Sequence, residues 1–256
     1  MFAFNHPLPL YATARKGVWP PRVLNHHDSN APPRHIPAMR RDIGTDPHDA
    51  PRPGMFANAP VFIRKDFLDE TTADALLDYA LAHREAFRST RVGIKDRART
   101  DPQNRISLAM RDLGEFRQVL DDRVTAGLPE MLASLPMTPI SIAKIEMELV
   151  AHGDGAFYGR HIDPNPHGEA DTIRALSGVY YFHARPRAFS GGQLRLYPSA
   201  SGAIDKFIDV DPTHNSFAVF PSWVTHEVMP VRCPSNQFED SRFSVNCWVR
   251  VARKPG

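Results

Sequence analysis

The second half of the chain is a series of short apolar or alternating segments separated by turn residues. These segments are residues 142–149, 176–182, 193–197, 204–210, 216–220, 224–229 and 242–251. Short strands at regular spacing, punctuated by Gly, Pro and Asp, are typical of a β-sandwich or barrel. With 256 residues, 42% of them hydrophobic, the chain can form one sizeable domain with an appendage, or two small domains. The pattern predicts a mainly β fold.

The first half is expected to support the β-rich half with helices. Residues 69–72 are typical of a helix start, and the residues that follow form an apolar stripe with helical spacing. The stripe is Ala73, Leu76, Leu77, Ala80 and Leu81. A second helix is predicted at about 114–134, broken or kinked at residues 127–129, where Pro129 removes a backbone hydrogen bond. Residues 61–63 and 106–110 are predicted strands, and the helices are expected to brace one sheet from outside.

Residues 1–55 differ from the rest of the chain. They hold ten of the 24 prolines and show no helical or strand period. Such a segment buries too little surface to offset its ordering entropy, so it is predicted to be a flexible tail or an extended arm. The predicted organisation is a Pro-rich extension over 1–55 and one domain over 56–256, with helical support at about 60–135 and a β core at about 140–251.

Two histidines and one aspartate in the β-rich half have the composition of a metal site. His161-Ile162-Asp163 is followed by His226 more than sixty residues later. Two histidines and a carboxylate are the ligands that hold non-haem Fe(II) and leave three positions open. On a strand, side chains at i and i+2 share a face, so His161 and Asp163 both reach inward while Ile162 packs on the other side. Together the three residues are predicted to be both the iron ligands and the catalytic residues. Each of them alone is more typical of a solvated loop residue or of a core group whose hydrogen bonds are satisfied.

The segment from Arg242 to Arg250 alternates between two kinds of side chain. One face carries Arg242, Ser244, Asn246, Trp248 and Arg250, and the other carries Phe243, Val245, Cys247 and Val249. If the first face looks into the barrel, the guanidinium of Arg242 needs an anion, and a carboxylate is its best geometric match. A dicarboxylate cosubstrate would supply it. The alternative is a polar face that meets solvent.

Five segments resemble the Fe(II)/2-oxoglutarate-dependent dioxygenase superfamily, and within it the prolyl 4-hydroxylase-like group. They are most similar to the oxygen-sensing prolyl hydroxylases. The segments are residues 158–164, 179–182, 190–198, 226–230 and 242–248, in the family's order. They cover less than half of the chain, and residues 60–135 resemble the family's helical support more loosely.

The resemblance implies a double-stranded β-helix of the jelly-roll or cupin-like kind. It further implies that Arg242 binds the remote carboxylate of 2-oxoglutarate, that Tyr181 hydrogen-bonds the same group, and that Ser244 belongs to this cofactor-binding set. Tyr180, one position out of register, is expected to face the other way. The implied substrate pocket consists of Tyr158, Arg174, Trp248, His152 and Asn246.

Two departures from the family pattern bear on the substrate. His152 stands near the place where the group has a tyrosine close to the cosubstrate. The gap between His226 and Arg242 is also longer than usual, with residues 233–240 as an inserted loop. Loops 91–105 and 231–241 are long beside the predicted strands, and we expect them to cover the substrate.

The implied cofactors are Fe(II), 2-oxoglutarate and O2, with ascorbate as a reductant. The implied reaction hydroxylates an unactivated C–H bond of a prolyl residue in a protein, or of a small amino-acid-like molecule, and releases succinate and CO2. Two alternatives come from other classes. One is a non-catalytic β-helix protein that binds metal or 2-oxoglutarate. The other is a zinc-dependent hydrolase, since zinc also accepts two histidines and a carboxylate; it would not require Arg242.

Charge and cysteine content argue against several other classes. The net charge of +2 predicts no nucleic-acid partner and no anionic-membrane partner. The chain has no run of eighteen apolar residues, so no membrane span is expected, and its start lacks a signal-peptide pattern. Cys233 and Cys247 form neither a disulfide framework nor a zinc-ribbon spacing, which fits a reducing compartment. The prediction is a soluble cytoplasmic protein.

Overall fold

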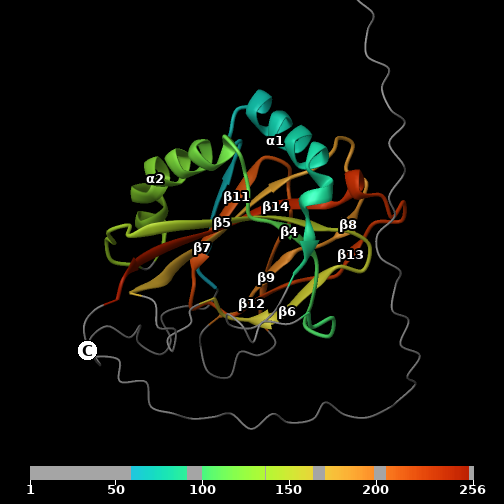
Figure 1. The fold of residues 1–256 in the computed structure, drawn as a ribbon. Helices are drawn as coiled ribbons and strands as arrows, with labels where there is room; N and C mark the ends of the chain where they lie inside the picture. The colour runs from blue at the N-terminus through green and yellow to red at the C-terminus, as the bar shows by residue number, and fades with distance from the viewer. Residues whose placement is uncertain (1–58, 91–99, 136, 164–170, 199–205, 254–256) are drawn as a thin grey trace, which may run out of the picture.

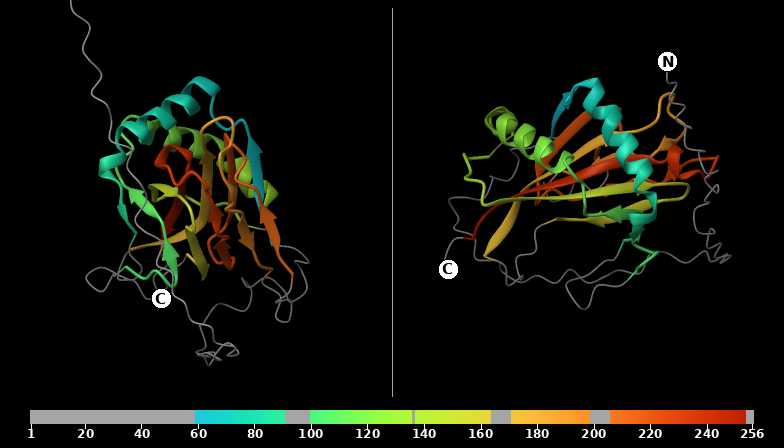
Figure 2. Two further views of the ribbon diagram at one scale, coloured as in Figure 1. Left: turned by 90° about the vertical axis from the view of Figure 1, so that its right-hand side faces the viewer. Right: turned by 45° about the horizontal axis from the view of Figure 1, so that its top comes forward.

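The computed structural model describes residues 59–90, 100–135, 137–163, 171–198 and 206–253. Within these ranges two antiparallel sheets face each other, and two helices lie across the outer face of the larger sheet (Figure 1). Figure 2 shows from two further sides that both helices cover the same side of that sheet. The predicted extension over residues 1–55 lies outside the described residues.

The large sheet has seven strands in the order β1-β11-β7-β14-β5-β4-β2. Its central strand, β14, pairs antiparallel with β7 on one side and with β5 on the other. The strands are β1 (Phe62–Lys65), β2 (Arg88–Ser89), β4 (Leu108–Met110), β5 (Lys144–His152), β7 (Thr172–Phe182), β11 (Ser216–Pro221) and β14 (Arg242–Ala252).

The small sheet has five strands in the order β10-β9-β12-β6-β3. The strands are β3 (Arg105–Ile106), β6 (Phe157–His161), β9 (Leu194–Leu196), β10 (Ile208–Val210) and β12 (His226–Val228). A separate ribbon pairs β8 (Ser190–Gly191) with β13 (Val231–Arg232). Two facing antiparallel sheets form the jelly-roll arrangement of a double-stranded β-helix, so the predicted mainly β fold is confirmed.

The helices α1 (Glu70–Ala82) and α2 (Phe116–Ser134) pack on the large sheet. Asp69 caps α1, because its Oδ1 accepts a hydrogen bond from the backbone N–H of Thr72 at 2.9 Å. The buried stripes of both helices form one core cluster with the apolar face of β14. Each fully buried leucine in such a cluster contributes about 2 kcal/mol relative to exposure. The prediction that helices brace one sheet from outside is confirmed.

The predicted break in the second helix is wrong. α2 runs without interruption from Phe116 to Ser134, and Pro129 lies inside it on the exposed side. An interior proline costs about 3 kcal/mol because it removes a hydrogen bond and crowds the preceding turn. Leu128 and Met131, on either side of Pro129, are buried against the sheet and together offset a cost of that size. Packing therefore overrides the local preference of the backbone.

The predicted strand over residues 106–110 is two strands in two different sheets. β3 pairs with β6, whereas β4 pairs with β5. Ser107, the single residue between them, is buried, and its carbonyl accepts hydrogen bonds from the backbone N–H and the hydroxyl of Thr90. The chain crosses from one sheet to the other at this residue and ties the two sheets together.

Neither α1 nor α2, nor any shorter helical turn in the described ranges, has the length and apolar character needed to cross a bilayer. Cys233 and Cys247 are both free thiols and both buried.

Candidate active site

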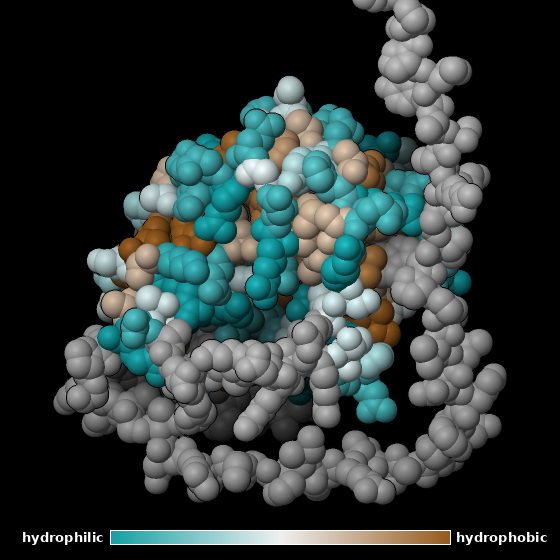
Figure 3. All heavy atoms as spheres, viewed as in Figure 1, coloured by the Kyte–Doolittle hydropathy of each residue, from teal (hydrophilic) through white to brown (hydrophobic). Residues whose placement is uncertain are grey.

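A cavity of about 500 Å³ lies between the two sheets. Its walls come from the inward faces of β5, β7 and β14 and from β6 and β12. Figure 3 shows a hollowed, largely hydrophilic region on the face turned to the viewer. The sequence-predicted residues that line the cavity are His152, Tyr158, His161, Asp163, Arg174, His226, Arg242, Asn246 and Trp248.

His161, Asp163 and His226 come together in this cavity, with their ligand atoms all within 4.8 Å of one another. Asp163 Oδ1 lies 3.8 Å from His161 Nε2, and its Oδ2 lies 3.6 Å from His226 Nε2. Residues so far apart in sequence meet because β6 and β12 are adjacent and His161 pairs with His226. Two imidazoles and a carboxylate directed at one point can hold a divalent metal such as Fe(II) or Zn(II).

Backbone carbonyls orient both histidines. Nδ1 of His161 donates to the carbonyl of Gly159 at 2.8 Å, and Nδ1 of His226 donates to the carbonyl of Val224 at 2.9 Å. These bonds leave the lone pair on Nε2, the nitrogen that faces Asp163. Burial, together with the nearby His226, lowers the pKa of His161 to about 4. Its ring is therefore neutral at pH 7 and able to bind a metal.

Asp163 follows the strand rather than lying on it. β6 ends two residues earlier, and Ile162 is 50% exposed, so the prediction that Ile162 packs behind the pair is wrong. The Asp163 backbone N–H donates to the carbonyl of Ser222 at 3.1 Å, and the Ser177 hydroxyl donates to Oδ2 at 2.5 Å. Burial raises the pKa of Asp163, but the two histidines and Ser177 lower it below its ordinary value. The carboxylate is therefore ionised, as a metal ligand must be.

Arg242 is the largest of the fully buried side chains, at 1% exposure. Its Nε donates to the carbonyl of Gly192 at 2.8 Å, and its Nη1 lies 3.2 Å from His152 Nδ1 and 3.4 Å from Ser244 Oγ. Its Nη2 has no hydrogen-bond partner in the described part of the chain. Burial lowers the pKa of Arg242, because a desolvated cation without a counter-charge is unfavourable.

Tyr181 lies beside Arg242, whose guanidinium carbon is 4.9 Å from the tyrosine ring centroid. Tyr181 belongs to the core cluster between the sheets and Tyr180 to the cluster under the helices, so the two point to opposite faces. The Tyr181 hydroxyl, like Nη2 of Arg242, is buried and unpaired among the described residues. Burial raises the pKa of Tyr181 to about 12, so the hydroxyl keeps its proton. Two adjacent unpaired donors are suited to an anionic oxygen.

His152 and Ser244 both contact Nη1 of Arg242. Both are buried, and His152 pairs with Arg242 across β5 and β14. Burial, with the positive charge of Arg242, holds the pKa of His152 well below its ordinary value. The ring is therefore neutral and accepts a hydrogen bond from Arg242 Nη1. Tyr181 and Ser244 do not themselves line the cavity.

The residues predicted to form the substrate pocket surround the same cavity. Tyr158 stacks on His161, with ring centroids 3.7 Å apart and planes inclined by 20°. The guanidinium carbon of Arg174 lies 3.8 Å from the ring of Trp248, and its Nη1 lies 3.6 Å from Asp163 Oδ1. These positions make contact with a bound molecule feasible, and the assigned roles stay predictions.

Several charged residues that line the cavity were not predicted from the sequence, among them Arg105, Glu146 and Glu148. The alternating charges of β5 were visible in the sequence, but they read equally well as a solvent-exposed face. The useful indication was that β14, the strand paired with β5, also carries polar side chains on one face. Glu146 pairs in register with Trp248 and Glu148 with Asn246, so both glutamates share the inward face.

The two loops expected to cover the substrate have different outcomes. Within loop 91–105, residues 91–99 lie outside the described residues, whereas Arg105 lines the cavity. No residue of loop 231–241 lines the cavity, so that expectation is wrong. Phe238 of this loop instead packs in the core against Phe87 and Phe243, with ring centroids 5.1 and 5.2 Å away.

Comparisons with known proteins add to this geometry. Residues 147–250 match the family model described as the 2OG-Fe(II) oxygenase superfamily. An uncharacterized PKHD-type hydroxylase of Synechocystis sp. is 42% identical over 137 residues. That alignment covers 52% of this chain and 45% of the relative, so the chain spans less than half of the length of this relative.

Two solved prolyl hydroxylases share the fold. One, from Trichoplax adhaerens in complex with a hypoxia inducible factor oxygen degradation domain peptide fragment, has a TM-score of 0.56 and 23% identity over 74% of this chain and 83% of that chain. The other, a Pseudomonas putida prolyl-4-hydroxylase, has a TM-score of 0.53 and 22% identity over 76% and 94%. Residues 147–250 of this chain are thus similar to the 2OG-Fe(II) oxygenase superfamily, and the chain shares its fold with two solved prolyl hydroxylases.

Proposed function

We propose that the chain is an Fe(II)- and 2-oxoglutarate-dependent dioxygenase that hydroxylates an unactivated C–H bond. The observation that carries this proposal is the buried, partly unpaired guanidinium of Arg242 beside the unpaired hydroxyl of Tyr181. Arg242 lines the same cavity as the histidine–aspartate cluster. A hydrolase would need only the metal ligands, whereas a buried cation with free donors is explained by a ligand that brings an anion.

In this proposal the residues have separate roles. His161, Asp163 and His226 hold Fe(II), since they offer two imidazole nitrogens and a carboxylate within 4.8 Å of one another. Arg242 and Tyr181 bind the remote carboxylate of 2-oxoglutarate through the donors that lack protein partners. Such charge-assisted bonds are about twice as strong as neutral ones.

When bound, Fe(II), 2-oxoglutarate and O2 supply the oxidising equivalents that convert a C–H bond to C–OH, with succinate and CO2 as the other products. The chain binds and orients these groups and excludes water from them. The Ser177 hydroxyl fixes the carboxylate of Asp163, and the Ser222 carbonyl fixes its backbone N–H. The Gly192 carbonyl and His152 fix the guanidinium of Arg242.

The proposed substrate is a prolyl residue or an amino-acid-like molecule. The fold is shared with two prolyl hydroxylases, one of them solved with a peptide fragment, which supports this class. The aromatic rings of Tyr158 and Trp248 and the polar groups of Arg174 and Asn246 line the cavity where such a substrate would lie.

The test is anaerobic addition of Fe(II) and then 2-oxoglutarate, followed by admission of O2. We expect a weak visible charge-transfer band from the metal-bound cosubstrate, and then slow formation of succinate. Arg242→Met should weaken 2-oxoglutarate binding by roughly 100-fold or more, because it removes the charged partner of the carboxylate. The matched control is Arg195→Met on β9, where Arg195 forms two 2.8 Å hydrogen bonds with Asp209. This control should keep the band.

The opposite result is equally informative. Tight zinc binding without a band or succinate would contradict the oxygenase and favour a hydrolase. A band without succinate under O2 would favour a protein that binds metal and 2-oxoglutarate but does not turn over.

A further inference from the structure

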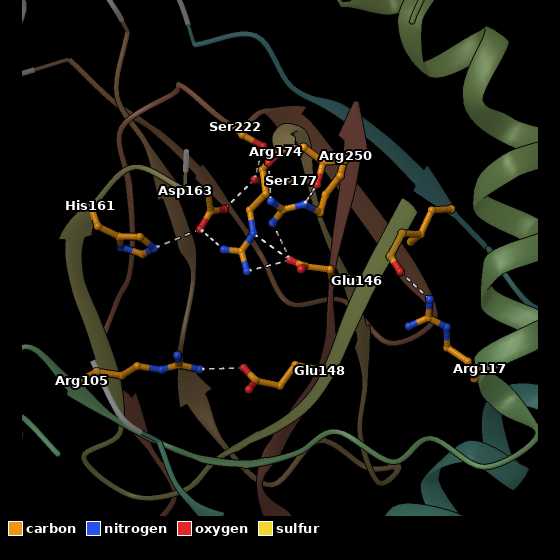
Figure 4. Close-up of polar contacts among 12 residues, drawn as sticks. Arg105, Arg117, Glu146, Glu148, His161, Asp163, Arg174, Ser177, Ser222 and Arg250 are labelled. Carbon is orange, nitrogen blue, oxygen red and sulfur yellow. Dashed lines mark hydrogen bonds and ion pairs between the residues drawn. The ribbon is translucent and has the colours of Figure 1, made fainter. Parts of the chain in front are cut away.

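Two carboxylates of β5 face the cavity, and each meets an arginine. Glu146 contacts Arg174, and Glu148 contacts Arg105. Figure 4 shows the Arg174–Glu146 pair above the Arg105–Glu148 pair, with His161 to one side. The Arg105–Glu148 pair also joins the two sheets, since Arg105 lies on β3 and Glu148 on β5.

The Arg174–Glu146 pair is firmly held. Nε and Nη2 of Arg174 each lie 3.1 Å from Glu146 Oε2, and Arg250 Nη1 lies 3.2 Å from the same oxygen. Arg174 also stacks on Trp248 at 3.8 Å. A ligand would have to break all of these contacts to separate the pair, which therefore acts as part of the cavity wall.

The Arg105–Glu148 pair is held loosely. A single contact of 3.4 Å joins the two side chains, and Arg105 Nε donates to the Ser107 hydroxyl at 3.0 Å. Both side chains are nevertheless mostly buried, with 11% and 19% exposure. The pair combines two mostly desolvated charges with a single long contact.

Arg105 is also close to the metal-ligand cluster. Its guanidinium lies 4.7 Å from the ring centroid of Tyr158, and Tyr158 stacks directly on His161. A molecule that binds Arg105 and Glu148 would therefore lie one aromatic ring away from a predicted iron ligand. At this distance a small substrate can contact the Arg105–Glu148 pair and the metal-ligand cluster at the same time.

Separating a desolvated ion pair is costly unless each charge receives a new partner. A neutral molecule offers no partner to either charge, and a simple anion would leave Glu148 unpaired. A zwitterion offers both partners, because its carboxylate can bind Arg105 and its ammonium can bind Glu148. The exchange replaces one long contact with two close ones.

We propose, on the basis of the oxygenase function proposed above, that the substrate is a free amino acid. Its carboxylate binds Arg105 and its ammonium binds Glu148. An internal prolyl residue has an uncharged amide on each side and offers neither group. The cavity of about 500 Å³ falls within the range of small-molecule sites.

The first test measures succinate formation by the wild-type protein with Fe(II), 2-oxoglutarate, ascorbate and O2. The probes are the common L-amino acids, with acetyl-prolinamide as the fully blocked prolyl probe. We expect at least one free amino acid to raise succinate formation above the rate without substrate. Its N-acetyl and carboxamide derivatives should each lose roughly 30-fold in kcat/KM, because each lacks one of the two charges.

The second test measures binding of the active amino acid by calorimetry without O2, with Fe(II) and 2-oxoglutarate bound. Arg105→Gln and Glu148→Gln should each weaken binding by roughly 30-fold. The double variant contains neither charge, so no unpaired ion remains. Its affinity therefore reports the loss of contacts with the amino acid, separately from the loss of fold stability that an unpaired buried ion causes. The matched control is Arg195→Gln, since Arg195 on β9 pairs with Asp209 and is not among the residues that line the cavity. It should bind normally.

Three results would overturn the proposal. One is stimulation by acetyl-prolinamide but by no free amino acid. Another is an absence of stimulation by every probe although the cosubstrate band and slow succinate formation are present, which leaves the oxygenase function standing. The third is a change in melting temperature of the Arg105 and Glu148 variants without a change in affinity, which would make the pair purely structural. An absence of both band and succinate would instead refute the oxygenase function itself.

Discussion

Arg242 and His152 form a buried polar pair in the wall of the cavity. Arg242 is 1% exposed and His152 is 3% exposed. The histidine accepts a hydrogen bond from the arginine only while it is neutral, so its protonation would place two positive charges side by side. The protein therefore depends on a histidine that resists protonation, and this dependence should be visible in the stability of the fold.

We predict that His152→Gln makes stability less sensitive to acid. The pKa of folded His152 is held well below 6.5 by burial and by Arg242. Below pH 6.5 the unfolded chain takes up a proton at this residue that the folded protein does not. The stability from neutral His152 is thus present above that pH and is lost as the pH falls toward the folded pKa. Glutamine, which cannot titrate, should reduce the slope of unfolding free energy against pH by up to about 1.4 kcal/mol per pH unit.

The measurement is denaturant unfolding of the metal-free wild type and variant across the acid range. Equal slopes for the two proteins would mean that His152 has no part in the pH dependence.

At the scale of elements, the turn between β8 and β9 holds Arg242 in place. Gly192 in this turn has φ of +71°, and a Cβ there would lie 2.6 Å from Arg242 Cδ and 2.9 Å from Val231 Cγ2. The carbonyl of the same glycine accepts the hydrogen bond from Arg242 Nε. A short turn therefore determines where the guanidinium lies.

Gly192→Ala should displace Arg242 and weaken 2-oxoglutarate binding by at least about tenfold, since both the steric contact and the altered carbonyl act on the guanidinium. Gly155→Ala is the matched control, because Gly155 has φ of +73° but nothing within 4 Å of its added Cβ. Both variants should lose about 1–2 kcal/mol from the left-handed backbone conformation. Calorimetric titration with 2-oxoglutarate distinguishes them, and equal affinities would contradict this role for the turn.

Particular elements show what the sequence can and cannot predict. The sequence correctly predicts which face of β14 and which face of α1 pack in the core, because each element has one apolar face. Pro129 and Ile162 are mispredicted, since the first is tolerated through packing of its neighbours and the second follows the end of a strand. The glutamates of β5 are missed for a different reason: a polar face is the same in sequence whether it meets solvent or a cavity.

At the scale of the whole molecule, the described residues form two main core clusters. One cluster joins both helices to the outer face of the large sheet, and a second lies between the two sheets. The two are contiguous through strands that belong to both, such as β7. The described residues therefore contain the apolar contacts that a single cooperative domain requires.

Removal of residues 1–55 should accordingly leave the melting temperature within a few degrees of the full chain, because a 1 kcal/mol change corresponds to only about 2–4 °C for a domain of this size. Fe(II) and 2-oxoglutarate should raise the melting temperature of both proteins equally. Thermal unfolding by circular dichroism provides the measurement. Loss of cooperative unfolding in the shortened chain would show that the first 55 residues belong to the domain.

The crossing at Ser107 has a consequence for how chains of this kind can diverge. Because one residue separates β3 from β4, an insertion or deletion beside it would slip one of these strands by a position and turn alternate side chains to the opposite face. Arg105 or Met110 would then exchange sides. Insertions and deletions among relatives are therefore expected to accumulate away from Ser107. Relatives that align without gaps around this residue should keep the same cavity.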